Sequence, residues 1–322
     1  MKRFFIILIL TFYYAVVCAQ NSADNTVAEK IPFKLFNNHI YLQARINNSK
    51  PLWFVLDTGA GDILDTKHAK SLNLVLYSTE PTSGSGEGSQ DAATTKNVSF
   101  QIQNKNFTLE EIAVIALQGV EDCANKIAVD STGKATMLEN ASGNTDQYQP
   151  MDGVLGFGFF KTFVVEINYN QQFLTLYDST TYHYRGNGKV IPIDISGNHI
   201  FINGSVKKSG AANIKGRFMI DTGLMLAVTL NTAFIEKNNL LPPSDQTTPF
   251  SICGLGGTSK AQMGTLPGVF IQNIYIDKPR TLFSQATGGV LSSTEFDGLI
   301  GNAIFRHFKV IFDYSNKQMI LE

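Results

Sequence analysis

The sequence has 322 residues, a length that accommodates about two domains of ordinary size. Hydrophobic residues make up 43% of the chain and charged residues 16%, which is enough apolar material for a large core and excludes an intrinsically disordered protein. The 26 basic and 27 acidic residues leave a formal net charge of −1, so charge gives no reason to expect nucleic acid or an anionic membrane as a partner.

Residues 1–19 have the pattern of a secretory signal peptide. A basic start precedes an apolar run at 4–17, which is shorter than a membrane-spanning helix needs. We therefore expect an exported chain (periplasmic, secreted or at the cell surface) with no membrane span in its mature form. An uncleaved anchor is one alternative. A lipid on Cys18 is another, which the bulky Val17 disfavours.

The first half of the remaining chain has the turn signals and apolar runs of a β lobe. Its predicted elements, in chain order, are a strand at 53–56, an Asp-Thr-Gly turn at 57–59, a short helix at 66–72 capped by Asp65, a glycine-rich stretch at 84–88, a polar surface insertion at 128–149, an Asp-Gly-Val-Leu-Gly segment at 152–156 and a hairpin over 163–176.

The second half repeats this order. Its predicted elements are a strand at 217–220, an Asp-Thr-Gly turn at 221–223, a helix at 232–238 capped by Asn231, a glycine-rich stretch at 254–257, an Asp-Gly-Leu-Ile-Gly segment at 297–301 and a hairpin over 309–321. Asn-His-Ile also occurs in both halves, at 38–40 and 198–200.

This internal repeat predicts two similar lobes. We place the first lobe at 20–185 and the second at 186–322, joined through a polar segment at 178–189. We therefore predict an all-β protein with two barrel-like lobes related by a pseudo-two-fold axis and a few short helices. The insertion at 128–149 has no predicted chemistry.

The paired turns also predict a catalytic mechanism. A pseudo-two-fold axis brings equivalent residues together, and two carboxylates that meet there share one proton. One carboxyl then acts as general base on a water, while the other polarises a substrate carbonyl. We assign these roles to Asp57 and Asp221. The hydroxyls of Thr58 and Thr222 tie the turns together, and the supporting glycines, Gly59 and Gly223, permit a close approach.

With both turns and both Asp-Gly segments in view, the chain resembles the pepsin and retropepsin superfamily of aspartic proteases. The most specific match is Leu299 through Asp313, which is similar to the C-terminal end of pepsin-like enzymes. The resemblance implies a bilobal endopeptidase that binds an extended polypeptide between its lobes, under flaps that close over it. The flap candidates are Gly84, Gly86, Gly88, Gly254, Gly256 and Gly257.

A catalytically impaired relative that binds extended peptides or another ligand is the alternative function. It rests on Leu224, a bulky residue where the family has Ala, Ser or Thr. Neither Ala60 nor Leu224 supplies a hydroxyl to a carboxylate, so we predict activity in the weakly acidic range. We expect a monomer that needs no cofactor or metal and binds no nucleic acid.

The remaining cysteines and histidines carry no predicted chemistry. A bond between Cys123 and Cys253 would bridge the two halves, and two buried free thiols are an equally good interpretation. The histidines lack metal-ligand spacing, so we expect structural or surface roles for all of them and no zinc site. They are His39, His68, His183, His199 and His307.

Overall fold

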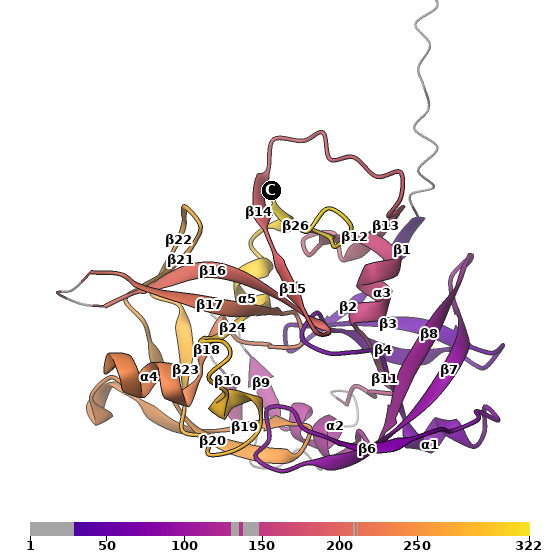
Figure 1. Cartoon of the computed structure of the whole chain (residues 1–322), viewed down its shortest axis with the longest axis horizontal. Coiled ribbons are helices and arrows are strands. Elements are labelled where there is room, and N and C mark those ends of the chain that lie inside the picture. Colours follow the sequence, from indigo (N-terminus) through magenta and orange to yellow (C-terminus); the bar gives the residue numbers. More distant parts are fainter. Residues whose placement is uncertain (1–28, 130–134, 138–147, 209, 211) are drawn as a thin grey trace, which may run out of the picture.

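The computed structural model describes residues 29–129, 135–137, 148–208, 210 and 212–322 (Figure 1). The predicted signal peptide and Cys18 lie outside the described residues, as does most of the predicted insertion at 128–149. Strands make up most of the described chain and the helices are short, so the predicted all-β class is confirmed. In this part of the chain no helix is both long and apolar enough to cross a membrane.

The first half forms an eight-stranded sheet in the order β2-β3-β4-β11-β5-β8-β7-β6. Because β3 also pairs with β7, six of these strands close into a barrel. Along β7, Val98, Phe100 and Ile102 alternate with more polar residues and are buried, as the two-residue period of a strand requires. The bounds are β2 (Lys34–Phe36), β3 (His39–Ile46), β4 (Leu52–Leu56), β5 (Ile63–Asp65), β6 (Thr79–Thr82), β7 (Gln90–Ile102), β8 (Lys105–Ile115) and β11 (Gly153–Leu155).

The second half forms a ten-stranded sheet in the order β19-β20-β23-β18-β24-β17-β16-β21-β22, with β15 paired to β16. Its bounds are β15 (Asp194–Ser196), β16 (His199–Lys207), β17 (Ile214–Asp221), β18 (Val228–Leu230), β19 (Thr248–Gly254), β20 (Gly257–Thr265), β21 (Gly268–Ile271), β22 (Ile274–Asp277), β23 (Arg280–Ser284) and β24 (Gly298–Gly301).

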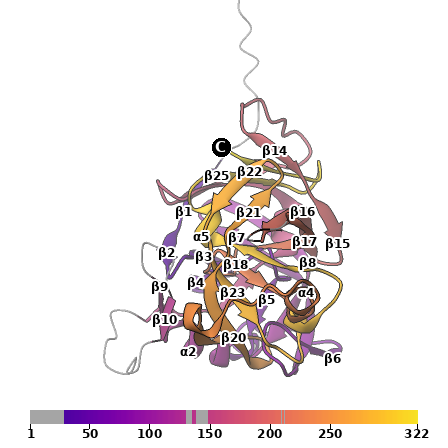
Figure 2. The ribbon, with the colours of Figure 1, turned by 90° about the vertical axis from the view of Figure 1, so that its left-hand side faces the viewer.

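A third, six-stranded sheet joins the halves in the order β1-β13-β12-β25-β26-β14. Its bounds are β1 (Glu29–Pro32), β12 (Phe163–Asn168), β13 (Phe173–Asp178), β14 (Lys189–Pro192), β25 (Lys309–Asp313) and β26 (Gln318–Leu321). Strands β12 and β25 pair antiparallel at the seam, with Val165 opposite Phe312. Figures 1 and 2 show this sheet at one end of the molecule, and β6 and β20 at the opposite end. The strands that carry the two turns lie between these ends.

Each lobe builds the same crossing of strands around its turn. In the first, β11 pairs parallel with β4 and antiparallel with β5. In the second, β24 pairs parallel with β17 and antiparallel with β18. Gly153 is needed at this crossing, because a Cβ there would overlap the Phe54 ring and the carbonyl of Ile63. The predicted Asp-Gly segments therefore support the turns directly.

The helices are short, and one predicted cap is wrong. They are α1 (Thr66–Ala69), α2 (Gln118–Ala124), α3 (Phe157–Thr162), α4 (Thr232–Asn238) and α5 (Asn302–Phe305), with 3-10 turns at Ser244–Gln246 and Val290–Ser292. Asp65 caps α1 by accepting from the Lys67 N–H at 2.8 Å. Asn231 precedes α4 without capping it. Its amide nitrogen donates to the carbonyls of Ser293 and Phe296, and its side-chain oxygen accepts no hydrogen bond from the described residues.

The described part of the insertion packs between the lobes. A two-stranded sheet of β9 (Ile127–Val129) and β10 (Ala135–Met137) follows α2. Ile127 and Ala135 are buried in a cluster that otherwise comes from the second lobe and includes Leu226 and Phe296. Asn37 holds this segment by donating to the Ile127 carbonyl at 2.5 Å. The start of the insertion therefore contributes to the lobe interface.

Candidate active site

Two buried threonines join the Asp-Thr-Gly turns by a symmetric set of hydrogen bonds. The Thr58 N–H donates to Thr222 Oγ1 at 3.0 Å, and the Thr222 N–H donates to Thr58 Oγ1 at 3.0 Å. The hydroxyl of Thr58 donates to the Ile220 carbonyl at 2.8 Å, and that of Thr222 to the Leu56 carbonyl at 2.9 Å. Both side chains are fully buried, so these four bonds fix one lobe against the other.

The two aspartates face each other where the lobes meet. A Cβ on Gly59 would lie 2.7 Å from Asp221 Cγ, and a Cβ on Gly223 would overlap Oδ2 of Asp57. Each glycine thus lies directly against the opposite carboxyl group, an approach that a larger residue would block. The Gly59 N–H also donates to Asp57 Oδ1 at 2.7 Å. The structure therefore brings together all six residues that the sequence assigned to this pair.

Burial holds the pKa of Asp221 well above its ordinary value. The negative charge of Asp57 and a side-chain hydrogen bond to Asp57 raise this pKa further, while backbone N–H groups of Gly223 and Leu224 lower it by less. A carboxyl with a raised pKa keeps its proton where an ordinary one has lost it. The pair therefore holds one proton between its two carboxyl groups where ordinary carboxyls have lost theirs.

Leu224 packs into the second lobe. Its side chain lies against the cluster that contains Met219 and Leu299, and its Cγ would lie 2.6 Å from a Cβ on Gly301. Gly301 is thus the position that makes room for Leu224. The atoms that crowd Gly59 and Gly223 are those of the opposite aspartate in each case, and none belongs to Leu224.

The aspartates of the Asp-Gly segments anchor the strands that lead into the turns. Asp152 Oδ2 accepts from the Trp53 N–H at 2.8 Å, and Asp297 Oδ2 accepts from the Arg217 N–H at 2.7 Å. His68 also lies 2.6 Å from Asp152 Oδ1. These bonds fix β4 and β17 four residues before Asp57 and Asp221, so the strand that leads into each turn is held in place.

Residues 42–159 match the family model described as aspartyl protease. The resemblance to the aspartic proteases is therefore confirmed. The match covers the first turn, with Asp57, and the Asp-Gly segment at 152–156. No curated protein gave a significant match to the chain.

The first lobe carries a hairpin whose tip meets a second hairpin from the other lobe. We name β6–β7 (79–102) the first flap and β19–β20 (248–265) the second flap. The N–H groups of Gly84 and Gly86 both donate to the Leu255 carbonyl at 3.1 Å, and the Gly88 N–H donates to the Gly256 carbonyl at 3.0 Å. The two glycine-rich stretches are thus flap tips that lie against each other.

Glycine is needed where the tips touch. A Cβ on Gly86 would lie 2.5 Å from backbone atoms of Gly256 and Gly257. Gly256 and Gly257 themselves have φ angles of 86° and 100°, a region that L side chains rarely adopt. Together with Gly254, which packs against Ser85, they let the second flap turn within two residues.

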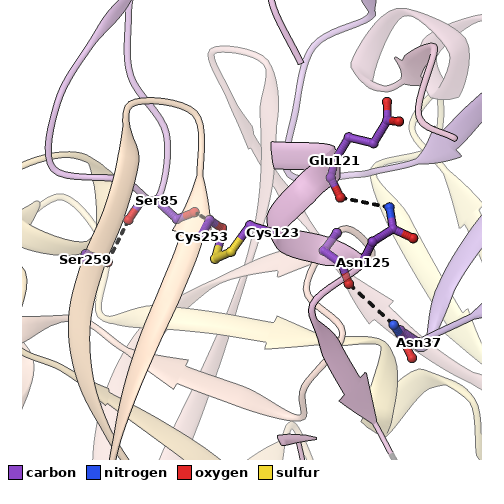
Figure 3. The surroundings of a disulfide bond; sticks show 8 residues. Asn37, Ser85, Glu121, Cys123, Asn125, Cys253 and Ser259 are labelled. Atoms are coloured by element: carbon purple, nitrogen blue, oxygen red, sulfur yellow. Dashed lines mark hydrogen bonds between the residues drawn. A yellow bond between two sulfur atoms is a disulfide. The ribbon is translucent and has the colours of Figure 1, made fainter. Parts of the chain in front are cut away.

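A disulfide fixes the second flap to the first lobe (Figure 3). Cys123 lies in α2 and Cys253 in β19, next to the flap tip, with their Cα atoms 6.2 Å apart. Beside the bond, the Ser259 hydroxyl donates to the Ser85 carbonyl at 2.8 Å, which ties the two flaps together. The sequence left this pairing open, and the structure shows that the bond crosses between the lobes.

Two histidines belong to this site, and the sequence analysis did not assign them there. His39 is buried, and its Nε2–H donates to the Gly223 carbonyl at 2.7 Å. His199 is half-buried, and burial lowers its pKa, an effect that the charge of Asp57 and the Gly59 backbone offset in part. The repeated Asn-His-Ile segments were the sequence signal for this pair. His183 and His307 are exposed, as surface roles predict.

Asn302 is a further residue that the sequence analysis missed. Its side-chain amide donates to the Thr222 carbonyl at 2.5 Å and to the Asn38 carbonyl at 2.8 Å, while its oxygen accepts from the Tyr169 hydroxyl at 2.6 Å. It is fully buried, so it locks the second turn to the first lobe. Among the described residues, no group of three or more His, Cys, Asp or Glu is arranged to hold a metal ion.

Proposed function

We propose that this protein is an exported aspartic endopeptidase that hydrolyses peptide bonds with a water activated between Asp57 and Asp221. One observation carries the proposal. Two carboxyl groups from different lobes meet at one place, and the pKa of Asp221 is raised by burial and by Asp57. Such a pair holds one acid and one base at the same pH, which peptide hydrolysis requires.

In the first step, the Asp57 carboxylate takes a proton from water as the water oxygen attacks the scissile carbonyl carbon. The proton on Asp221 moves to the carbonyl oxygen, so a neutral gem-diol forms and the charges balance. Asp57 is now the protonated partner and Asp221 the charged one. The burial that raises the pKa of Asp221 keeps this carboxyl protonated, so that a proton is present for the developing oxyanion.

In the second step, Asp57 gives its proton to the leaving amine as the carbon–nitrogen bond breaks. Asp221 takes a proton back from the gem-diol, which becomes the new carboxylic acid. The pair returns to its starting state without any external reactant. The threonine bonds and the anchoring by Asp152 and Asp297 keep both carboxyl groups in place through these transfers.

The substrate that suits this site is a polypeptide in extended conformation. Flap backbone groups near Gly84 and Gly256 are of the kind that pair with an extended chain, as a strand pairs with a sheet edge. In the present structure these groups bond to each other. We therefore propose that the flap tips separate to admit a peptide. Since one chain supplies both aspartates, we also propose that the active form is a monomer.

The test is hydrolysis of unfolded casein between pH 3 and 8, with and without pepstatin. We expect cleavage by the wild type, inhibition by pepstatin, and at least about a thousandfold lower kcat for Asp57→Asn and for Asp221→Asn. Asp245→Asn, which changes an exposed aspartate in a 3-10 turn, is the matched control and should cleave normally. Retention of peptide without cleavage by the wild type and both site variants would favour the alternative function, a peptide-binding relative.

We propose export on two grounds. Residues 1–19 have the pattern of a signal peptide, and the disulfide between Cys123 and Cys253 suits an oxidising compartment. Cell fractionation combined with mass spectrometry of the mature N-terminus tests this. A cytosolic chain that retains residues 1–19 would contradict it, and a mass increase on Cys18 would point to the lipid-anchored alternative.

A further inference from the structure

One histidine in each lobe occupies the same place in the repeat. In the first lobe, the antiparallel register of β3 and β4, continued by two residues, places His39 across from Asp57. In the second lobe, the register of β16 and β17, continued in the same way, places His199 across from Asp221. The duplicated fold therefore sets two imidazole rings beside the two carboxyl groups.

Each ring contacts the turn of the opposite lobe. His39 donates from Nε2 to the Gly223 carbonyl at 2.7 Å, and the Gly59 backbone lies close enough to His199 to offset part of the lowering of that ring's pKa by burial. His39 is only 6% exposed, so its bond is made away from competing water. Gly223 and Gly59 are the residues that lie against the carboxyl groups. A shift in either glycine therefore shifts the contact between Asp57 and Asp221.

The neighbouring asparagine strengthens this link in the first lobe. The Asn38 amide donates to the Met225 carbonyl at 2.9 Å, four residues beyond Asp221. Arg306 donates to Asn38 Oδ1 at 2.8 Å and so fixes the orientation of that amide. Asn38, in the turn before β3, and His39, at the start of β3, thus hold two carbonyls in or just after the opposite Asp-Thr-Gly turn, which is more than the packing of a core strand needs.

We propose that His39 and His199 are positioning residues for the aspartate pair, each holding the glycine of the opposite lobe's Asp-Thr-Gly turn. This inference rests on the proposed function. The histidine contacts differ from the threonine bonds in the backbone groups that they hold. The threonines join the backbones of the two turns, whereas the histidines set the glycine carbonyls that lie beside the carboxyl groups.

The rings act as neutral donors. A carbonyl only accepts, so Nε2 of His39 carries the hydrogen, and Nδ1 has no partner among the described residues. Burial lowers the pKa of both histidines, an effect only partly offset by the backbone bonds and by the charge of Asp57. Tyr41 is another titratable neighbour of His39, with ring centroids 6.3 Å apart. Both rings therefore favour the neutral form more than a free imidazole does, and the neutral ring of His39 keeps its Nε2–H donor.

The experiment compares His39→Phe, which removes the donor, with His39→Gln, which places an amide N–H near the position of Nε2. We expect kcat for a casein-derived peptide to fall about ten- to a hundredfold in His39→Phe, with KM changed less than about threefold. His39→Gln should recover most of the loss. His183→Phe, which changes an exposed histidine, is the matched control. Equal kcat in His39→Phe and wild type, or equal losses in His39→Phe and His39→Gln, would overturn the proposal.

A second readout does not depend on catalysis. NMR titration of carbon-13-labelled aspartate side chains should show a lower pKa for Asp221 in His39→Phe, because its contact with Asp57 loosens. In His39→Gln the pKa of Asp221 should stay at its wild-type value. If no variant cleaves peptide but this titration moves as stated, the proposed function fails and the positioning role stands. An unmoved titration overturns the positioning role. If His39→Phe does not fold, His199→Phe at the half-buried site carries the same test.

Discussion

Replacing Thr58 by valine tests the link between the lobes with almost no change of shape. The Thr58 hydroxyl accepts from the Thr222 N–H and donates to the Ile220 carbonyl, and valine can do neither. Two buried backbone groups would then lose their partners. At about 1–3 kcal/mol for each, the free energy of unfolding should fall by about 2–6 kcal/mol. Thr58→Ser keeps the hydroxyl and loses one methyl group, worth about 1 kcal/mol.

The assay is urea unfolding of wild type, Thr58→Val and Thr58→Ser at one pH, followed by kcat for the same peptide. We expect the stability order wild type, Thr58→Ser, Thr58→Val, and a fall in kcat for Thr58→Val because the aspartates lose their fixed separation. Thr58→Ser is the internal control, because it alters the same side chain but keeps the hydroxyl. If Thr58→Val is as stable as Thr58→Ser, the cross-lobe bonds do not stabilise the fold as argued.

Three further predictions follow from the site and its surroundings. The double variant Cys123→Ala/Cys253→Ala should lose up to about 5 kcal/mol of unfolding free energy, because the bond closes a loop of 130 residues; an unchanged urea midpoint would contradict this. Burial raises the pKa of Asp62 to about 6, so its charge is unfavourable in the folded state. Wild type should therefore lose about 2 kcal/mol of unfolding free energy between pH 4 and pH 7 relative to Asp62→Asn. Parallel stability profiles for those two proteins would refute the reasoning. Activity should peak in weak acid and fall as pH rises through the raised pKa of Asp221, since the shared proton is then lost. Ala60→Ser, which adds a hydroxyl beside the pair, should move the pH–rate profile to lower pH, and an unmoved profile would count against that cause.

The centre of the site could be predicted because the chain repeats itself. A repeat identifies which residues are equivalent, and a pseudo-two-fold axis brings equivalent residues together. The meeting of Asp57 with Asp221, and of Thr58 with Thr222, follows from this alone. The flap tips followed from glycine-rich stretches at matching places, although the sequence did not predict that the tips bond to each other.

The rest depends on strand register and on packing, which a single sequence does not reveal. His39 reaches the site because β3 and β4 pair in one particular register. Asp62 has no carboxylate counterpart in the second lobe, so the repeat gave no signal for its burial and its bonds to the N–H groups of Gly156 and Gly158. The pairing of Cys123 with Cys253 depends on where α2 meets the second flap.

The sheet that joins the halves has a consequence for each half taken alone. A chain ending after β13 would expose the backbone of β12 along an edge whose side chains, including Val165 and Ile167, are buried here by β25. Such an edge recruits another strand, so we expect a lone half to associate with its own copy. In the intact chain, the partner strand β25 comes from the second half of the same polypeptide. The molecule therefore resembles a dimer whose two halves differ in sequence. Because the two halves need not be identical, one half keeps Asp62 where the equivalent position in the other half is Val228.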